Sequence, residues 1–184
     1  MTDLRSGCSL GSVRTRPATR ADAPVVAEIW YRGWRDGHEG HVPDALAEVR
    51  THESFRSRAA ERVDDTTVAV VDGAVAGFVM VVAAEIEQVY VAREHRGTGV
   101  AARLLSEGER LVAANGFEQA WLAVVADNVR ARRFYERSGW TDEGAFEYLA
   151  AGPEGTISVP ARRYVKAEVC DAVIRSSRSG RPEP

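Results

Sequence analysis

The chain has few cysteines, little net charge and no long hydrophobic run. Its two cysteines, Cys8 and Cys170, are too few for a disulfide framework and lack the spacing of metal ligands, so we expect no metal. A net charge of −3 gives no basis for recruitment by nucleic acid or by a membrane surface. No apolar run is long enough to cross a membrane, and the first twenty residues lack a signal-peptide core. These absences predict a cytoplasmic protein with reduced thiols and with neither nucleic acid nor membrane as a partner.

The length and composition are those of one globular domain. The 184 residues are 45% hydrophobic and 28% charged, which is sufficient for a sizeable core. We expect a single domain at residues 13–169. The small and polar residues 1–12 predict a disordered tail before it, and the Ser-, Arg- and Pro-rich residues 170–184 predict a flexible tail after it.

Hydrophobic periodicity and turn residues predict a mixture of strands and helices. The first helix is expected to begin near Pro24, with Asp22 as its cap and Trp30 packed in the core. A second helix is predicted from Pro43 to about residue 63. The remaining pattern predicts strands at 13–16, 66–71, 74–83 and 85–91, a helix from residue 100, a strand at 117–126, a helix at 128–138, and strands at 140–148 and 157–166.

The stretch 85–105 reads as a strand, a short basic loop and the opening of a helix. The β-branched and aromatic residues at 89–91 favour a half-buried strand, and the apolar positions change to helical spacing from Val100. Between them lie Gly97 and Gly99, with Arg96 alongside. Because a helix start offers free N–H groups and partial positive charge, this loop predicts a phosphate-binding site.

Two other phosphate-binding loops and a purely structural turn compete with this interpretation. A Walker loop needs a Gly-Lys-Ser/Thr ending, and the only lysine of the chain is Lys166. The dinucleotide pattern G-x-G-x-x-A is satisfied by Gly97, Gly99 and Ala102, but four residues separate strand and loop, and about half the chain comes first. The glycines could also serve only to relieve strain in a strand-to-helix turn. A nicotinamide-binding protein therefore stays as an alternative.

Two motifs resemble signatures of one known family. Arg96-x-x-Gly99-x-Ala101 resembles the Q/R-x-x-G-x-G/A signature of the GCN5-related N-acetyltransferase (GNAT) superfamily. Residues 128–140, N-V-R-A-R-R-F-Y-E-R-S-G-W, resemble the family's N-x-x-A-x-x-F-Y-E-x-x-G-F/W. Two motifs in the family's order are more specific than either alone, and the resemblance covers nearly the whole chain.

The resemblance implies the GNAT acyl-CoA N-acyltransferase fold, of the α/β (α+β) class. Such a fold has a mixed, mostly antiparallel central sheet of about seven strands, flanked by about four helices. Its strands at 85–91 and 117–126 would lie parallel and splay apart. A splayed edge leaves backbone N–H and C=O groups unpaired, and an amide-bearing ligand can satisfy them.

The resemblance also implies acetyl-coenzyme A (acetyl-CoA) as the cofactor. Its pantetheine arm is expected to bond like an added strand to Val89, Tyr90 and Val91, and to contact the amide of Asn128. Asn128 also suits a helix cap. The diphosphate is expected on the N–H groups of the loop and helix start, which belong to Arg96, Gly97, Thr98, Gly99, Val100 and Ala101. In the family motif Tyr135 protonates the departing thiolate, although a tyrosine after Phe134 could simply pack in the core.

Glu85 and Glu87 are the candidates for the general base. Their spacing of two puts both on one face of a strand. Glu85 matches, by register from the glycine loop, the glutamate that is the base in histone-modifying members of the family. Other members use a glutamate on the following strand, where this chain has Ala123. A pair of solvated carboxylates and a water-mediated base remain open alternatives.

The acceptor is expected to contact the joint between the first two helices, and also the last strand pair. In that joint Trp34, His38 and His41 are candidate substrate contacts. The function implied is transfer of the acetyl group to a primary amine of a small molecule or peptide by direct attack in a ternary complex. A non-catalytic acyl-CoA-binding sensor is the main alternative, and family members commonly form homodimers.

Overall fold

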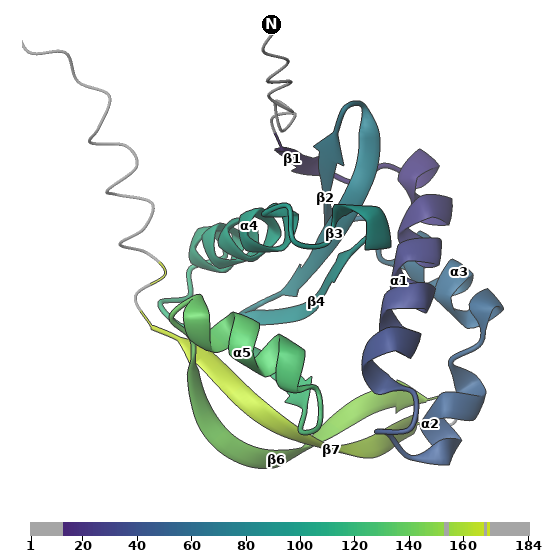
Figure 1. Cartoon of the computed structure of the whole chain (residues 1–184), viewed down its shortest axis with the longest axis vertical. Coiled ribbons are helices and arrows are strands. Elements are labelled where there is room, and N and C mark those ends of the chain that lie inside the picture. The colour runs from purple at the N-terminus through teal and green to yellow at the C-terminus, as the bar shows by residue number, and fades with distance from the viewer. Residues whose placement is uncertain (1–12, 153–154, 168, 170–184) are drawn as a thin grey trace, which may run out of the picture.

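A mixed sheet with strand order β1-β2-β3-β4-β5-β7-β6 separates two layers of helices (Figure 1). This computed structural model describes residues 13–152, 155–167 and 169. The predicted tails at 1–12 and 170–184, and with them both cysteines, lie outside the described residues. Within the described residues, no helix is both long and apolar enough to cross a membrane.

The strands confirm the predicted mixed and mostly antiparallel sheet. Every neighbouring pair is antiparallel except β4 and β5, which run parallel. The strands of the described chain are β1 (Arg14–Pro17), β2 (Thr66–Val71), β3 (Ala74–Val82), β4 (Glu85–Val91), β5 (Ala120–Val125), β6 (Thr141–Gly152) and β7 (Gly155–Lys166).

The helices cover both faces of the sheet, with α1, α2 and α3 on one side and α4 and α5 on the other (Figure 1). Short 3₁₀ turns precede α1 and α4, at Arg20–Asp22 and Arg93–His95. The α-helices of the described chain are α1 (Ala23–His38), α2 (Asp44–Val49), α3 (His52–Glu61), α4 (Val100–Ala114) and α5 (Val129–Arg137).

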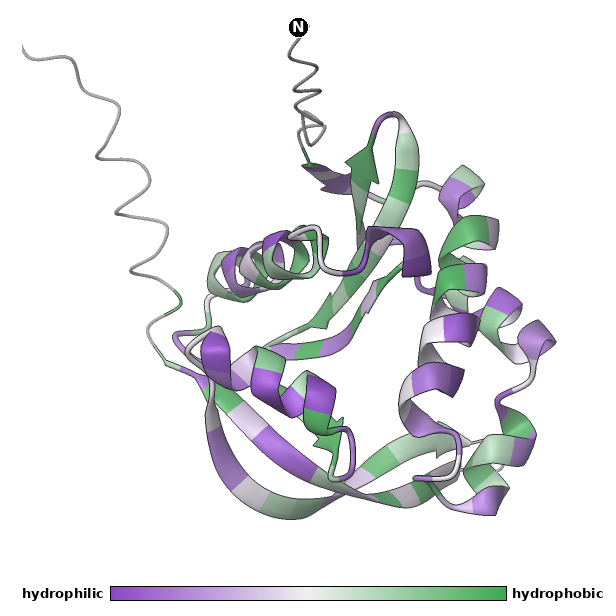
Figure 2. Cartoon of the chain, viewed as in Figure 1, coloured by the Kyte–Doolittle hydropathy of each residue, from purple (hydrophilic) through white to green (hydrophobic). Residues whose placement is uncertain are grey.

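Each face of the sheet has its own hydrophobic core. Trp30 of α1 is 1% exposed and packs edge-on against Phe55 and Phe78, with ring centroids 5.3 and 5.8 Å away, which confirms its predicted core position. On the other face α4 approaches β4 closely, because a Cβ at Gly108 would lie 2.9 Å from Ile86 Cδ1. The apolar colouring of β2 and β3 and the mostly polar α5 reflect this layering (Figure 2).

Three predicted boundaries differ from the structure. The single helix predicted over 43–63 is wrong, because Arg50 leaves the helical conformation and Thr51 caps a second helix, accepting the Ser54 N–H at 3.2 Å. The strand predicted from residue 117 begins only at Ala120, since residues 115–117 still terminate α4 through bonds to its last turn. The final hairpin is longer than predicted, and β6 reaches residue 152.

Asp22 occupies the cap position of α1, but its carboxylate bonds backwards rather than to that helix. It accepts the Thr19 N–H and hydroxyl, both at 2.8 Å, and two bonds from Arg16 at 2.8 and 2.9 Å. The Arg16 guanidinium holds the pKa of Asp22 well below its usual range. Asp22 therefore ties β1 to the entry of α1, which carries one wall of the site described below.

Asp22→Asn should lower the free energy of unfolding by about 2 kcal/mol at pH 7, because the bonds to Arg16 lose their charge assistance. The folded pKa of Asp22 is depressed, so its contribution is present above the unfolded pKa and is lost as the pH falls below about 4. Urea denaturation at pH 7 and pH 3 measures both effects. Asp64→Asn, at an exposed carboxylate, is the control. A loss of equal size at both pH values would contradict the assigned ion pair.

Candidate active site

The site begins where β4 and β5 separate. Among the described residues, Glu85 and Trp121 form the one paired position of these strands, supported by the Trp121 N–H donating to Ala84 O at 3.0 Å. Beyond this point the strands diverge, which confirms the predicted splayed parallel pair. A cavity of about 320 Å³ is lined by both strands, α1, α3, the α5 end and the β6–β7 hairpin.

A β-bulge in β4 accompanies the divergence. Val81 pairs with Ile86 and Met80 pairs with Gln88, so Glu87 is an extra residue without a partner on β3. A bulge bends its strand and increases the local twist. The bulge therefore directs the following residues away from β5.

Beyond the bulge, successive β4 side chains enter different cores. Val89 and Val91 pack on the α4 side, whereas Tyr90 packs on the α1 side. The Tyr90 ring lies so close to α1 that a Cβ at Gly33 would be 2.4 Å from its Cδ1. Val89 and Tyr90 line the cavity, so the predicted cofactor-contact stretch lies on the diverging part of the strand.

The glycine loop has the predicted geometry of a strand-to-helix turn. Gly97 and Gly99 have φ of 83° and 90°, in the left-handed region that favours glycine, and Gly99 is the N-cap of α4. Nothing lies within 4 Å of a Cβ added at either glycine, so the space over the loop is open. The N–H groups of Val100 and Ala101 belong to the first helical turn and precede Arg103, whose N–H donates to Gly99 O at 3.1 Å as the first bond of the helix.

Arg96 is bound to the protein rather than extended over the glycines. Its Nη1 lies 2.7 Å from Asp36 Oδ2, and its Nε donates to Val91 O at 3.3 Å. The 3₁₀ turn at Arg93–His95 fills the four-residue gap between strand and loop. The loop is thereby joined both to the end of β4 and to α1.

Asn128 and Tyr135 lie on the opposite wall of the cavity. Asn128 caps α5, with Oδ1 accepting the Ala131 N–H at 3.1 Å, which confirms the cap. Tyr135 also packs against Trp140 and Tyr164, with ring centroids 6.1 and 6.0 Å away. Burial raises the pKa of Tyr135 to about 12, so its hydroxyl keeps its proton at neutral pH.

The two carboxylates of β4 lie in different environments. Glu87 lines the cavity and accepts Arg62 Nη2 at 2.8 Å. Burial, and then the charge of Glu87, raise the pKa of Glu85 to about 7, against the opposing effects of Tyr148 and Arg163. The proton affinity of Glu85 therefore suits a base at neutral pH, but Glu85 is not among the residues that line the cavity.

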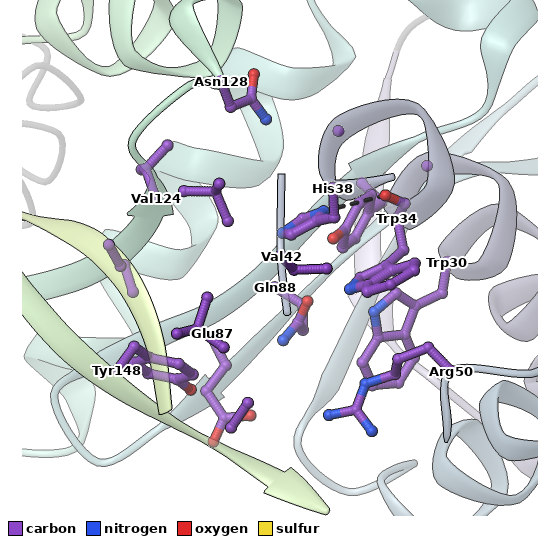
Figure 3. Close-up of a pocket in the computed structure, with 18 of the residues that line it drawn as sticks. Trp30, Trp34, His38, Val42, Arg50, Glu87, Gln88, Val124, Asn128 and Tyr148 are labelled. Carbon is purple, nitrogen blue, oxygen red and sulfur yellow. Dashed lines mark hydrogen bonds between the residues drawn. The ribbon is translucent and has the colours of Figure 1, made fainter. Parts of the chain in front are cut away.

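Trp34 and His38 line the cavity, and their rings stack nearly parallel with centroids 5.3 Å apart (Figure 3). His38 Nδ1 lies 3.1 Å from the Trp34 carbonyl oxygen, which can only accept, so Nδ1 carries the hydrogen. Burial lowers the pKa of His38 to about 4, and the ring is neutral at pH 7.

His41 lies outside the cavity lining, half-exposed, with Nδ1 3.4 Å from Asp127 Oδ2. In the described parts of the chain, no cluster of His, Cys, Asp and Glu could hold a metal ion.

Sequence reasoning missed the arginines and the hairpin tyrosine that line the cavity. Arg50 reaches it because the chain breaks between α2 and α3, and Tyr148 reaches it from β6. Arg58 of α3 and Arg62, the residue that caps its C-terminal end, are four residues apart, a spacing that places two side chains on one helical face. That spacing is the one feature of the sequence that could have predicted two arginines on the same wall of the cavity.

Solved structures share this fold. A GCN5-related N-acetyltransferase from Rhodopseudomonas palustris aligns with a TM-score of 0.65 at 21% identity, covering 86% of this chain and 97% of that one. A phosphinothricin acetyltransferase from Sinorhizobium meliloti, in complex with acetyl-CoA, aligns at 0.63 and 19% identity over 85% and 88%. The PaiA N-acetyltransferase of Thermoplasma acidophilum, in complex with coenzyme A, aligns at 0.59 and 17% identity over 85% and 99%. At these identities the likeness establishes the fold class, that of the GNAT acyltransferases.

Sequence comparison gives the family itself. The model of the acetyltransferase (GNAT) family matches residues 26–140, more than half of the chain. An uncharacterized N-acetyltransferase of Mycobacterium tuberculosis is 29% identical over 112 residues, which are 56% of this chain and 72% of the relative; a Mycobacterium bovis protein of the same description matches equally. The chain belongs to the acetyltransferase (GNAT) family, and the predicted enzyme class, an N-acetyltransferase, is confirmed.

Glu85→Gln should stabilise the protein increasingly as the pH rises. The folded pKa of Glu85 is raised from 4.5 to about 7, so the folded state resists ionising this carboxyl, and stability is lost as the pH rises through 7. The variant minus wild-type difference in unfolding free energy should therefore grow by about 2 kcal/mol between pH 5 and pH 8. Denaturant titrations at both pH values measure it, with Glu48→Gln on exposed α2 as the control. A pH-independent difference would show that Glu85 titrates normally.

Proposed function

We propose that this protein transfers the acetyl group of acetyl-CoA to a primary amine of a small molecule or peptide, by direct attack in a ternary complex. The observation that carries the proposal is that one cavity joins the open part of β4, a tyrosine that keeps its proton and the β4 carboxylate Glu87, with Glu85 two residues before it outside the lining. Family membership supports it, as do relatives of the same fold whose structures hold acetyl-CoA or coenzyme A.

The residues fit the cofactor predicted from the sequence. Acetyl-CoA supplies an acetyl group activated as a thioester. The open edge of β4 at 89–91 offers backbone groups to its amide-bearing arm, and the amide of Asn128 faces the same cavity. The loop and helix-start N–H groups at 96–101 lie beside open space and suit the diphosphate. Arg96 would add its charge only by leaving Asp36.

Tyr135 and Glu85 are assigned opposite proton roles. A hydroxyl whose pKa is about 12 holds a proton that it can donate to the departing sulfur. Glu85, with a pKa of about 7, can accept the proton that the amine must lose, and water would relay it because Glu87 and Tyr148 stand on the cavity surface. The Glu87 carboxylate is already engaged by Arg62, whose Nη2 donates to it at 2.8 Å. Backbone N–H groups near Val89 are proposed to stabilise charge on the acetyl oxygen.

Tyr135→Phe should reduce kcat about 100-fold, because it removes the proton donor and leaves the ring in place. Affinity for acetyl-CoA should change little. Free-thiol release with an acceptor panel measures turnover, and thermal shift with acetyl-CoA measures binding.

Tyr164→Phe is the matched control, since that hydroxyl bonds Arg132 and Glu136 and lies outside the cavity lining. Unchanged turnover in Tyr135→Phe would remove the assigned role. Binding of acetyl-CoA without transfer to any amine would favour a sensor, and stabilisation by NAD instead would favour the dinucleotide alternative.

The pH–rate profile should rise through about pH 7 as Glu85 loses its proton. Glu85→Gln should abolish this acidic limb and lower kcat at pH 8 about 100-fold. Glu87→Gln should keep the limb but move its midpoint to lower pH, because the neighbouring negative charge that raises the pKa of Glu85 is gone. If the limb persists unchanged in Glu85→Gln, another group is the base.

A further inference from the structure

Two arginines face the cavity from the α1–α3 side without a carboxylate partner in the described chain. Arg50, in the link between α2 and α3, donates to the Ala151 carbonyl at 2.7 Å and forms no ion pair with a described residue. Arg58, on α3, also lines the cavity, and its Nε is buried without a hydrogen-bond partner in the same part of the chain. Because a buried charged N–H without an acceptor is costly, the Arg58 Nε, beside a second arginine without an ion pair, points to a missing anion.

Around the cavity, the groups that the structure describes do not neutralise these charges. Burial and the charge of Arg58 lower the pKa of Arg50 to about 10, and burial also lowers the pKa of Arg58. A guanidinium keeps its proton at neutral pH, so both arginines are still charged. Burial also raises the pKa values of Tyr90 and Tyr148, which therefore stay neutral. The Trp30 ring lies 5.0 Å beneath the Arg58 guanidinium and compensates only part of its desolvation.

Arg62, at the C-terminal end of α3, is an arginine of the same cavity wall whose charge is compensated by carboxylates. It donates to Asp65 at 2.7 Å and to Glu87 at 2.8 Å. Glu87, whose negative charge acts on Arg58, is thereby already engaged. The cavity is consequently lined by two arginines without an ion pair in the described chain, Arg50 and Arg58, and by the carboxylate of Glu87, which Arg62 engages. Figure 3 shows Arg50 and Glu87 entering it from different elements.

We propose that the acetyl acceptor is an amine that also carries an anionic group, a carboxylate or a phosphonate, which Arg58 and Arg50 bind. This inference rests on the proposed function and names the acceptor class for it. The anion satisfies the guanidinium N–H groups, while the amine lies toward the carboxylates of β4. Polycationic acceptors such as polyamines are disfavoured, because two uncompensated positive charges repel them.

The test is an acceptor panel of matched pairs. L-Amino acids, β-alanine and γ-aminobutyrate are each compared with their carboxamides, and aminomethylphosphonate separates phosphonate from carboxylate recognition. Acetylation is followed by free-thiol release, and binding without turnover by thermal shift of the coenzyme A-bound protein. We expect the best acid to exceed its carboxamide by about 30-fold in kcat/KM and to raise the melting temperature where the carboxamide does not.

Arg58→Gln should lower kcat/KM for the acid about 30-fold and change that for the carboxamide less than about threefold. Arg56→Gln, on the exposed face of the same helix, is the matched control and should change neither. Arg50→Gln should act in the same direction as Arg58→Gln and serves if the latter fails to fold. The thermal shift with acetyl-CoA should be the same in all variants.

The outcomes separate this inference from the proposed function. Equal or better transfer to the carboxamides, or no effect of either cavity arginine on the acids, would overturn the anionic acceptor and leave the acetyltransferase standing. The anionic acceptor is likewise overturned if acetyl-CoA stabilises the protein but no anionic amine is acetylated or bound. Absence of any stabilisation by acetyl-CoA would instead overturn the proposed function.

Discussion

The separation of β4 from β5 is the constraint on which the rest of the structure depends. Two parallel strands that stayed paired would satisfy each other's backbone groups and leave no cavity. Here the pairing stops at Glu85, and the extra residue Glu87 bends β4 at once. The backbone exposed by this bend is open to water or a ligand, so the opening in the sheet also creates the strand edge to which we propose that the amide-bearing arm of the cofactor bonds.

An opened sheet needs other contacts to hold its walls, and polar contacts at the rim provide them. Arg96 joins the glycine loop to Asp36 of α1, and Arg50 joins the α2–α3 link to the β6–β7 hairpin at Ala151. His41 reaches Asp127 beside α5. Because exposed ion pairs contribute little stability, these contacts can break and re-form at small cost when ligands enter.

Sequence patterns predicted the features of the fold that neighbouring residues determine. The left-handed glycines, the β4 bounds and the Asn128 cap were all predictable, because turn residues and capping act over a few positions. The cavity arginines were not, since Arg58 acquires its environment only when α3 packs beside strands far away in sequence. The break at Thr51 was missed because a capping threonine competed with an otherwise continuous helical pattern. The bulge at Glu87 left no trace in the alternation of residues.

Burial has the same physical effect on three kinds of group in and beside this cavity but a different chemical consequence for each. It disfavours the charged form everywhere, so Tyr135 keeps its proton and the pKa of Glu85 rises to about 7. Applied to Arg58, the same desolvation cannot remove the charge, because the guanidinium pKa starts too high. An acid and a base can adapt to a dry cavity by holding their protons, whereas an arginine can adapt only by gaining an anion. The proton-transfer roles that we propose therefore need no further group, whereas the charge of Arg58 is compensated only when the anionic acceptor that we propose is bound.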